Sequence, residues 1–202
     1  IRRNIGAFVI VHAGGLDPGR SVLSGTRAEE YFSYDIAQEI SELSEVKQSR
    51  YVSTVNVLSD EIDGIKLGFM DKEEYEMYYP GTGPFKLVGV TDIQSFWNFS
   101  KGKDHLVEGR LLSFGETGNA VVLSQRVFEA NALKLGDRFS LSAYFNNDLS
   151  AELEVAGVHS GNDLNMQPEY ICNINYIYAP LEVAVRFSGV NGITEAEYEL
   201  ND

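Results

Sequence analysis

The first 60 residues contain two kinds of hydrophobic pattern. Residues 5–13 form an apolar run rich in β-branched side chains, which predicts a buried strand. Four apolar residues then recur at helical spacing and predict an amphipathic helix over residues 28–43, with Glu29 and Glu30 in its first turn. These four are Phe32, Ile36, Ile40 and Leu43. Residues 46–58 alternate between two faces and predict a long strand, so the pattern is β-loop-α-β.

The middle of the chain predicts shorter elements separated by turn-forming residues. Ser124 ends a buried strand over residues 120–124 and can cap a helix over residues 125–134. Gly136 suits the left-handed position after that helix. The other predicted elements are a strand at 85–90, helical turns within 93–99, and a hairpin of strands 138–145 and 151–159 with its turn at 146–148.

The remaining stretches are loop-rich or near the C-terminus. Residues 60–84 are acidic and turn-rich, with short strands expected around 65–70, and residues 100–119 and 160–170 are predicted loops. One or two strands are expected over residues 171–187, broken near Pro180, and a final strand over residues 193–200. The segments 85–90 and 153–158 resemble each other, because both alternate and end in Gly-Val. The simplest interpretation is that each glycine serves a bulge or turn.

Composition limits the possible functions. The chain has 202 residues and 44% apolar residues, enough for one large domain or two small lobes with a substantial core. Its net charge of −14 disfavours binding to nucleic acid and to anionic lipid headgroups. Cys172 is the only cysteine, which excludes an intrachain disulfide and a cysteine-based zinc cluster. The two ends, Ile1 and Asp202, are expected to be cut from a longer chain.

Motifs for common catalytic and binding chemistry are missing or incomplete. The glycine-rich segment 14–21 lacks the order of a phosphate-binding loop. The three histidines, His12, His105 and His159, have no metal-binding spacing, and no GxSxG sequence occurs. Residues 60–64 fail the calcium-loop pattern. We therefore assign no catalytic, cofactor-binding or metal-binding residue, although a hydrolase with scattered Ser, His and Asp residues stays possible.

Aromatic residues are frequent in the loop-rich middle. Tyr75, Tyr78, Tyr79 and Trp97 are the candidate partner-contact residues, because aromatic side chains anchor protein interfaces and stack on sugars. Packing in the core is the alternative interpretation. These residues also support a second hypothesis, a stand-alone extracellular module that binds glycan or peptide.

An ordered series of short motifs carries a family resemblance. The series is Val88-Gly89-Val90, an aromatic segment at 93–99, Glu108-Gly109-Arg110, Ala120-Val121-Val122-Leu123-Ser124, a short helix, Leu135-Gly136-Asp137, Val155-Ala156-Gly157-Val158 and Ile177-Tyr178-Ala179-Pro180-Leu181. This order resembles the periplasmic core domain of MacB/FtsX-type ABC-transporter permeases. The acidic stretch 60–84 and the loop 160–170 have no counterpart in the family pattern.

The resemblance implies an α+β fold with two lobes. Residues 1–62 and 172–202 would form a porter-like βαβ lobe, and residues 63–171 a central inserted lobe of mixed α/β structure. The domain would lie outside the cytoplasm on a membrane-anchored permease and would couple cytoplasmic ATP hydrolysis to conformational change during export. No cofactor is expected in this domain, because a separate cytoplasmic nucleotide-binding domain uses the ATP. Implied partners are that ABC ATPase, a second permease copy and an extracytoplasmic adaptor protein. The implied cargo is a peptide, antibiotic or lipoprotein.

Overall fold

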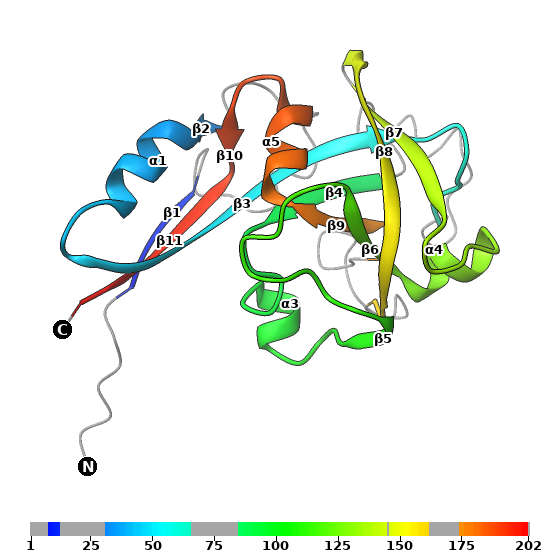
Figure 1. The fold of residues 1–202 in the computed structure, drawn as a ribbon, viewed down its shortest axis with the longest axis horizontal. Helices are drawn as coiled ribbons and strands as arrows, with labels where there is room; N and C mark the ends of the chain where they lie inside the picture. Colours follow the sequence, from blue (N-terminus) through cyan, green and yellow to red (C-terminus); the bar gives the residue numbers. More distant parts are fainter. Residues whose placement is uncertain (1–7, 13–30, 66–84, 145, 162–173, 202) are drawn as a thin grey trace.

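A single large sheet organises the fold. The computed structural model describes residues 8–12, 31–65, 85–144, 146–161 and 174–201, and the fold is given for these residues. Within them, nine strands form a mixed sheet in the order β1-β11-β3-β4-β9-β6-β8-β5, with β7 pairing both β3 and β8 (Figure 1). β2 and β10 form a separate pair.

The elements have the following bounds. The strands are β1 Phe8–His12, β2 Phe32–Ser33, β3 Val46–Leu58, β4 Phe85–Val90, β5 Leu106–Gly109, β6 Ala120–Ser124, β7 Arg138–Ala143, β8 Asn146–His159, β9 Tyr176–Pro180, β10 Gly192–Ile193 and β11 Glu195–Leu200. The helices are α1 Tyr34–Ser41, α3 Trp97–Ser100, α4 Gln125–Ala130 and α5 Leu181–Ser188.

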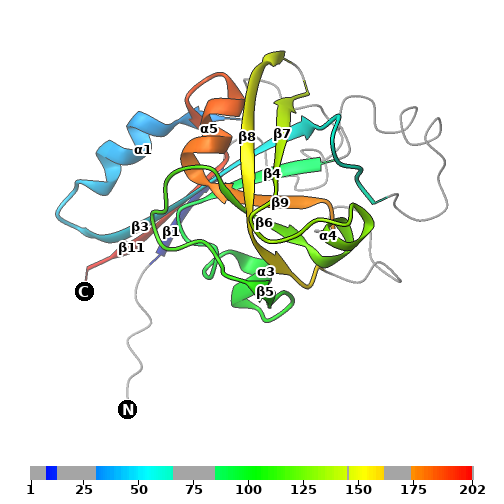
Figure 2. The ribbon, with the colours of Figure 1, turned by 45° about the vertical axis from the view of Figure 1, so that its right-hand side comes forward.

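The long strand β3 divides the described structure into two halves. Its first part, Val46 to Val52, pairs with β11, whereas Val52 to Val57 pairs with β4. We call residues 8–12, 31–51 and 189–201 the chain-end half, and residues 52–65, 85–144, 146–161 and 174–180 the central half. Helix α5 lies between them in both Figure 1 and Figure 2. The lobe boundaries expected from the sequence stay a prediction; β9, which they place with the chain ends, pairs with β4 and β6 of the central half.

The hydrophobic core follows the same division. The chain-end half has one cluster, made of Ala37, Tyr51, Leu181, Val185, Ile193, Ala196 and Tyr198. In the central half the sheet is covered on both faces, because successive residues of β4, β6 and β9 join different clusters. Helix α5 contributes Leu181 and Val185 to the chain-end cluster and Ala184 and Phe187 to a central one. Helix α5 therefore packs into both cores and connects them.

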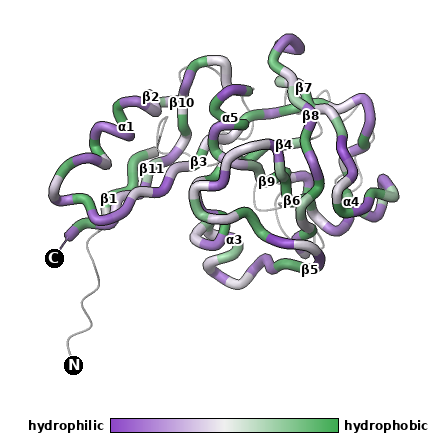
Figure 3. Tube along the Cα trace, viewed as in Figure 1, coloured by the Kyte–Doolittle hydropathy of each residue, from purple (hydrophilic) through white to green (hydrophobic). Residues whose placement is uncertain are grey.

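Helix α1 covers the chain-end half. Two tyrosine hydroxyls, from Tyr51 and Tyr198, donate hydrogen bonds to the same carbonyl oxygen of Ala37, at 3.1 and 3.0 Å. Burial, followed by the interaction with Tyr51, raises the pKa of Tyr198 to about 12, so its hydroxyl stays a donor. The hydropathy of α1 alternates along the helix (Figure 3), but its buried residue is Ala37, whereas Ile36 is exposed.

Many predicted strands are confirmed to the residue or nearly so. β3, β4 and β6 have the predicted bounds, β1 lies within the predicted strand 5–13, and β11 lies within the predicted strand 193–200. The predicted hairpin is formed by β7 and β8, but β8 already begins at Asn146, so the turn lies earlier than predicted. The expected strands around 65–70 and most of the loop 160–170 lie outside the described residues, as do Glu29 and Glu30.

The predicted helices needed correction at their ends. Helix α1 begins at Tyr34 because Ser33 caps it and Phe32 pairs with Ile193 in the β2–β10 pair. Helix α4 ends at Ala130, four residues early. The side chain of Asn131 exchanges two hydrogen bonds with the backbone of Asp63, which draws the chain away from the helix.

Three further predictions were wrong. Ala132, with φ of 51°, follows the end of α4 in the left-handed region; Gly136, with φ of 87°, lies in the next turn instead. Residues 106–109, expected in a loop, form the edge strand β5 on β8. Residues 181–188, expected to continue a strand, form α5. This helix begins after Pro180 and ends before Gly189, a pairing of residues typical of helix boundaries.

Candidate functional site at the junction of the two halves

The candidate site is the place where β3 passes from one half to the other. The pairing of β4 with β3 ends at Val90 and Val52, and Val52 also pairs with Glu195 of β11. Before Val52, β3 pairs with β11 along one edge. Along its other edge, the chain that leaves β4 contacts β3 at Tyr51 through Thr91. Any relative motion of the halves would therefore bend or twist the sheet near residues 50–52 of β3.

Hydrogen bonds between uncharged groups connect the two halves at this junction. The backbone N–H of Tyr51 donates to the hydroxyl of Thr91 at 2.9 Å, and the N–H of Thr91 donates to the carbonyl of Tyr51 at 3.2 Å. The buried hydroxyl of Ser53 donates to the carbonyl of Gly192 at 2.9 Å. Thr194 donates to the carbonyl of Val52 through its N–H at 2.8 Å and through its hydroxyl at 3.1 Å. These bonds tie β3 to segments from both halves.

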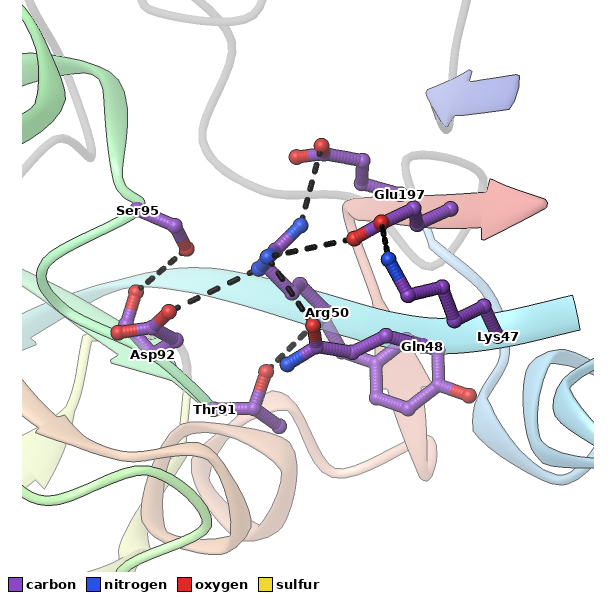
Figure 4. A network of polar contacts seen from close by, with 9 residues as sticks. Lys47, Gln48, Arg50, Thr91, Asp92, Ser95 and Glu197 are labelled. Atoms are coloured by element: carbon purple, nitrogen blue, oxygen red, sulfur yellow. Dashed lines mark hydrogen bonds and ion pairs between the residues drawn. The ribbon is translucent and has the colours of Figure 1, made fainter. Parts of the chain in front are cut away.

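An ionic network centred on Arg50 lies beside these bonds (Figure 4). Its guanidinium lies 3.6 Å from Asp92, 3.3 Å from Glu197 and 3.9 Å from Glu199. Asp92 follows β4 in the central half, whereas the two glutamates lie on β11 in the chain-end half. Lys47 also pairs with Glu199. The hydrogen bond from Lys47 and the charges of Lys47 and Arg50 outweigh the effect of desolvation, and they lower the pKa of Glu199.

Helix α5 packs closely on the sheet at Gly89. A Cβ atom at this position would lie 2.5 Å from the Cβ of Ala184 and 3.0 Å from the carbonyl oxygen of Leu181. Gly89 therefore lets the backbone of β4 approach α5, and the sequence interpretation of this glycine as a bulge or turn residue is wrong. The same motif, Val88-Gly89-Val90, leads directly into the junction at Thr91 and Asp92.

Three other motifs of the family resemblance meet at one point on β8. Gly109 has φ of 73° and lies against the carbonyl of Ala156, and a Cβ on Gly157 would lie 2.0 Å from the carbonyl oxygen of Arg110. Gly136 donates its N–H to the carbonyl of Val155 at 2.8 Å. The register of β6 on β8 skips Ala156, so a bulge lies directly before Gly157, which itself pairs with Val122. These motif residues have a structural role, because they allow backbones to cross.

A buried carboxylate and imidazole lie near the far edge of the central half. Asp104 and His159 have fully buried side chains, and Oδ2 of Asp104 lies 2.7 Å from Nδ1 of His159. Oδ1 of Asp104 accepts hydrogen bonds from the hydroxyl of Ser160 at 2.7 Å and from the N–H groups of His105 and Gly161, both at 3.0 Å. Burial acts to raise the pKa of Asp104, but the hydrogen bond and charge of His159 together with the other donors outweigh it and lower that pKa.

This cluster does not have the geometry of a hydrolase triad. A triad requires the serine hydroxyl on the imidazole nitrogen that faces away from the carboxylate. Here Ser160 donates to Asp104 itself, and Nε2 of His159 is buried without a hydrogen-bond partner in the described residues. The ring of His159 instead packs against Tyr178, with ring centres 5.0 Å apart. The arrangement joins α3 and its loop to β8 and is structural.

The predicted aromatic contact residues are only partly placed. Tyr75, Tyr78 and Tyr79 lie outside the described residues. Trp97 lies on α3 with 41% of its surface exposed, and the ammonium of Lys103 lies 4.7 Å from its ring centre. One face of the indole is therefore covered by a cation of the protein itself. Its role as a contact residue stays a prediction.

The helices of the described ranges are four to eight residues long. None of the helices in these ranges combines the length and the apolar character required to cross a membrane. Across the same ranges, no three His, Cys, Asp or Glu side chains are grouped in a way that could hold a metal ion.

Comparison with known proteins gives similarity at the level of the fold. No family model and no curated protein matches the chain. The structure is similar to the periplasmic region of MacB from Actinobacillus actinomycetemcomitans, with a TM-score of 0.51 and 17% identity, over 96% of this chain and 74% of that one. It is also similar to the extracellular domain of the noncanonic ABC-type transporter YknZ from Gram-positive bacteria, with a TM-score of 0.48 and 14% identity, over 97% and 84% of the two chains. The chain thus has the fold of the MacB periplasmic region, which confirms the α+β fold expected from the motif series.

Proposed function

We propose that this chain is the extracytoplasmic domain of an ABC-transporter permease and that it works by conformational change. The observation that supports this most strongly is the likeness in fold to the periplasmic region of MacB over 96% of the chain. The ordered motifs from Val88 to Val158 point to the same family independently. The motif residues lie where two backbones cross and where the chain passes from β4 into the junction. The fold therefore explains why these residue types are needed at these positions.

The placement of the chain-end strands fits this function. Phe8 of β1 pairs with Glu199 of β11, and Leu200 pairs with Val46 of β3. The entering and leaving strands therefore meet at the end of β3 that is farthest from the central half (Figure 1). In the proposed permease this end faces the membrane. A movement of membrane segments would then reach the chain-end half first.

The junction would pass that movement to the central half. β3 is continuous through both halves, and α5 contributes to both cores. A domain of this kind changes shape and contacts partners, and it requires no catalytic group of its own, provided that the two conformations differ in their contacts. A separate cytoplasmic ATPase domain would hydrolyse the ATP. The further partners in this proposal are a second permease copy and an extracytoplasmic adaptor protein, and the cargo is a peptide, antibiotic or lipoprotein.

The parent gene provides the first test. It should encode an apolar segment of about 20 residues before Ile1, long enough to span a bilayer, and should lie beside a gene for an ABC ATPase. A parent sequence without such a segment would exclude the proposal.

The second test measures movement. In the full-length parent protein, reconstituted with its ATPase in lipid nanodiscs, Glu129→Cys on α4 carries a spin label in a Cys172→Ser background. We expect ATP to change the distance between the labels of two permease copies, measured by pulsed electron resonance. An ATPase variant unable to hydrolyse ATP is the control. An unchanged distance during turnover would contradict the proposal.

A further inference from the structure

Arg50 has three anionic neighbours but forms a tight bond with none of them. Three carboxylates, from Asp92, Glu197 and Glu199, lie within 4 Å of its guanidinium, and each distance is 3.3 Å or more. A well-formed bond between guanidinium and carboxylate has a length of about 2.7–2.9 Å. The Nε atom of Arg50 is buried and makes no hydrogen bond in the described residues. Leaving such a donor unpaired costs free energy, so the observed position is a compromise.

Other arginines of the chain show that tight pairing is available to this fold. Arg110 bonds both oxygens of Glu116 at 2.8 and 2.7 Å, and Arg138 bonds Glu154 at 2.9 Å. Both side chains are more than half exposed, whereas the side chain of Arg50 is 20% exposed. Arg110 and Glu116 lie close together in one half, as do Arg138 and Glu154. Arg50 alone of these three is placed between anions of different halves.

The carboxylates on the two sides belong to segments with separate supports. Oδ1 of Asp92 accepts a hydrogen bond from the N–H of Gln94 at 3.0 Å, and its carbonyl accepts one from Ser95 at 3.1 Å, so Asp92 is held by its own turn in the central half. Glu197 lies on β11, which pairs with β1 and β3. A shift of roughly 0.7 Å would bring Oδ2 of Asp92 into a full charge-assisted bond with Nε of Arg50.

We propose that Arg50 is an exchangeable latch between the halves. In one conformation its guanidinium binds Asp92 tightly, and in the other it binds Glu197 and Glu199. Each conformation satisfies donors that the other leaves poorly paired, so a small movement at β3 shifts the balance between them. This use of the latch in force transmission rests on the proposed function. The exchange itself is a property of the isolated chain.

The test uses the isolated 202-residue chain, without ATPase or membrane. Spin labels are placed at Glu39→Cys on α1 and Glu129→Cys on α4 in a Cys172→Ser background, and the distance distribution between the halves is measured. Asp92→Asn removes the central anion and Glu197→Gln removes a chain-end anion. We expect these two variants to shift the mean distance in opposite directions, because each favours the competing partner. Arg50→Gln should broaden the distribution.

Arg138→Gln is the matched control, since it breaks an ion pair inside the central half and should leave the distance unchanged. Circular dichroism verifies that each variant is folded. Equal distances in all folded variants, or shifts of Asp92→Asn and Glu197→Gln in the same direction, would overturn the latch. Because no nucleotide is involved, that result would be distinct from a failure of the ATP-dependent movement expected of the full-length protein.

Discussion

Asp104 is a carboxylate with no exposed side-chain surface, and four donors surround it. Its Oδ2 can only accept a hydrogen bond, and its low pKa keeps it ionised, so Nδ1 of His159 carries the proton between them. A buried charge of this kind is tolerated because every nearby donor points toward it. The hydrogen bonds that Asp104 accepts therefore hold the loop after α3 in place.

Asp104→Asn is expected to lower the free energy of unfolding by at least about 2 kcal/mol, because the new amide N–H groups face donors and charge-assisted bonds are lost. Urea denaturation followed by tryptophan fluorescence measures this. Glu152→Gln, which weakens the exposed pair with Arg138, is the control and should cost much less. Equal losses in the two variants would contradict the structural role of Asp104.

The low pKa of Asp104 also predicts a dependence of stability on pH. Since the folded state lowers this pKa, the carboxylate stabilises the fold above its unfolded pKa of about 3.9, and this contribution is lost as the pH falls through the folded pKa. The free energy of unfolding should therefore fall below about pH 4 more steeply in the wild-type chain than in Asp104→Asn. Denaturation curves between pH 3 and pH 7 test this, and parallel pH profiles would contradict it.

At the scale of elements, α5 packs closely on β4 because Gly89 has no side chain. Gly89→Ala should destabilise the chain by about 1–3 kcal/mol, because the added methyl group overlaps Ala184 and α5 must move off the sheet. Gly89→Ala combined with Ala184→Gly should recover part of this loss, although a glycine inside a helix costs about 1 kcal/mol itself. Chemical denaturation of the two variants and of Ala184→Gly alone provides the comparison. A double variant less stable than the sum of both single losses would argue against this contact.

Elements differ in how far sequence pattern determines them. β3, β4 and β6 are well predicted because alternating or apolar runs end at clear turn residues. The sequence pattern predicts a strand where α5 forms, because the valines of this segment favour strands and most of its side chains are buried. Its available signals were Pro180 before it, Gly189 after it, and the exposed pair Glu182 and Arg186 spaced one helical turn apart. β5 was missed because all four residues are exposed and no alternation marks them.

The candidate site could not be found by local pattern. Arg50 and Glu197 are 147 residues apart in sequence, and only the pairing of β3 with β11 brings them together. Charged residues at alternate positions of a strand normally indicate a solvated face, and nothing in the sequence distinguishes Arg50 from Arg110 or Arg138. The motif series identified the fold because several of its glycines stand where two backbones approach closely. The topology of the fold determines these positions, and the requirement for glycine makes them visible in the sequence.

At the scale of the whole molecule, β3 and α5 determine whether the halves unfold together. β3 pairs with β11, β4 and β7, so neither half can lose its sheet without exposing part of this strand. The side chains of α5 fill both cores. Elements that are shared in this way couple local openings into larger cooperative units. A domain that transmits force through a junction requires such coupling.

Leu141→Ala tests the coupling by weakening the central core alone. Leu141 is fully buried on β7, and its truncation should cost about 2–5 kcal/mol. If the halves unfold as one unit, the slowest-exchanging amides of β11 in the chain-end half should lose hydrogen-exchange protection by the same factor as those of β8. Ile193→Ala, in the chain-end core, is the reciprocal variant and should lower protection in β8. Protection of β11 that survives Leu141→Ala unchanged would mean that the halves open independently and that β3 and α5 do not couple their unfolding.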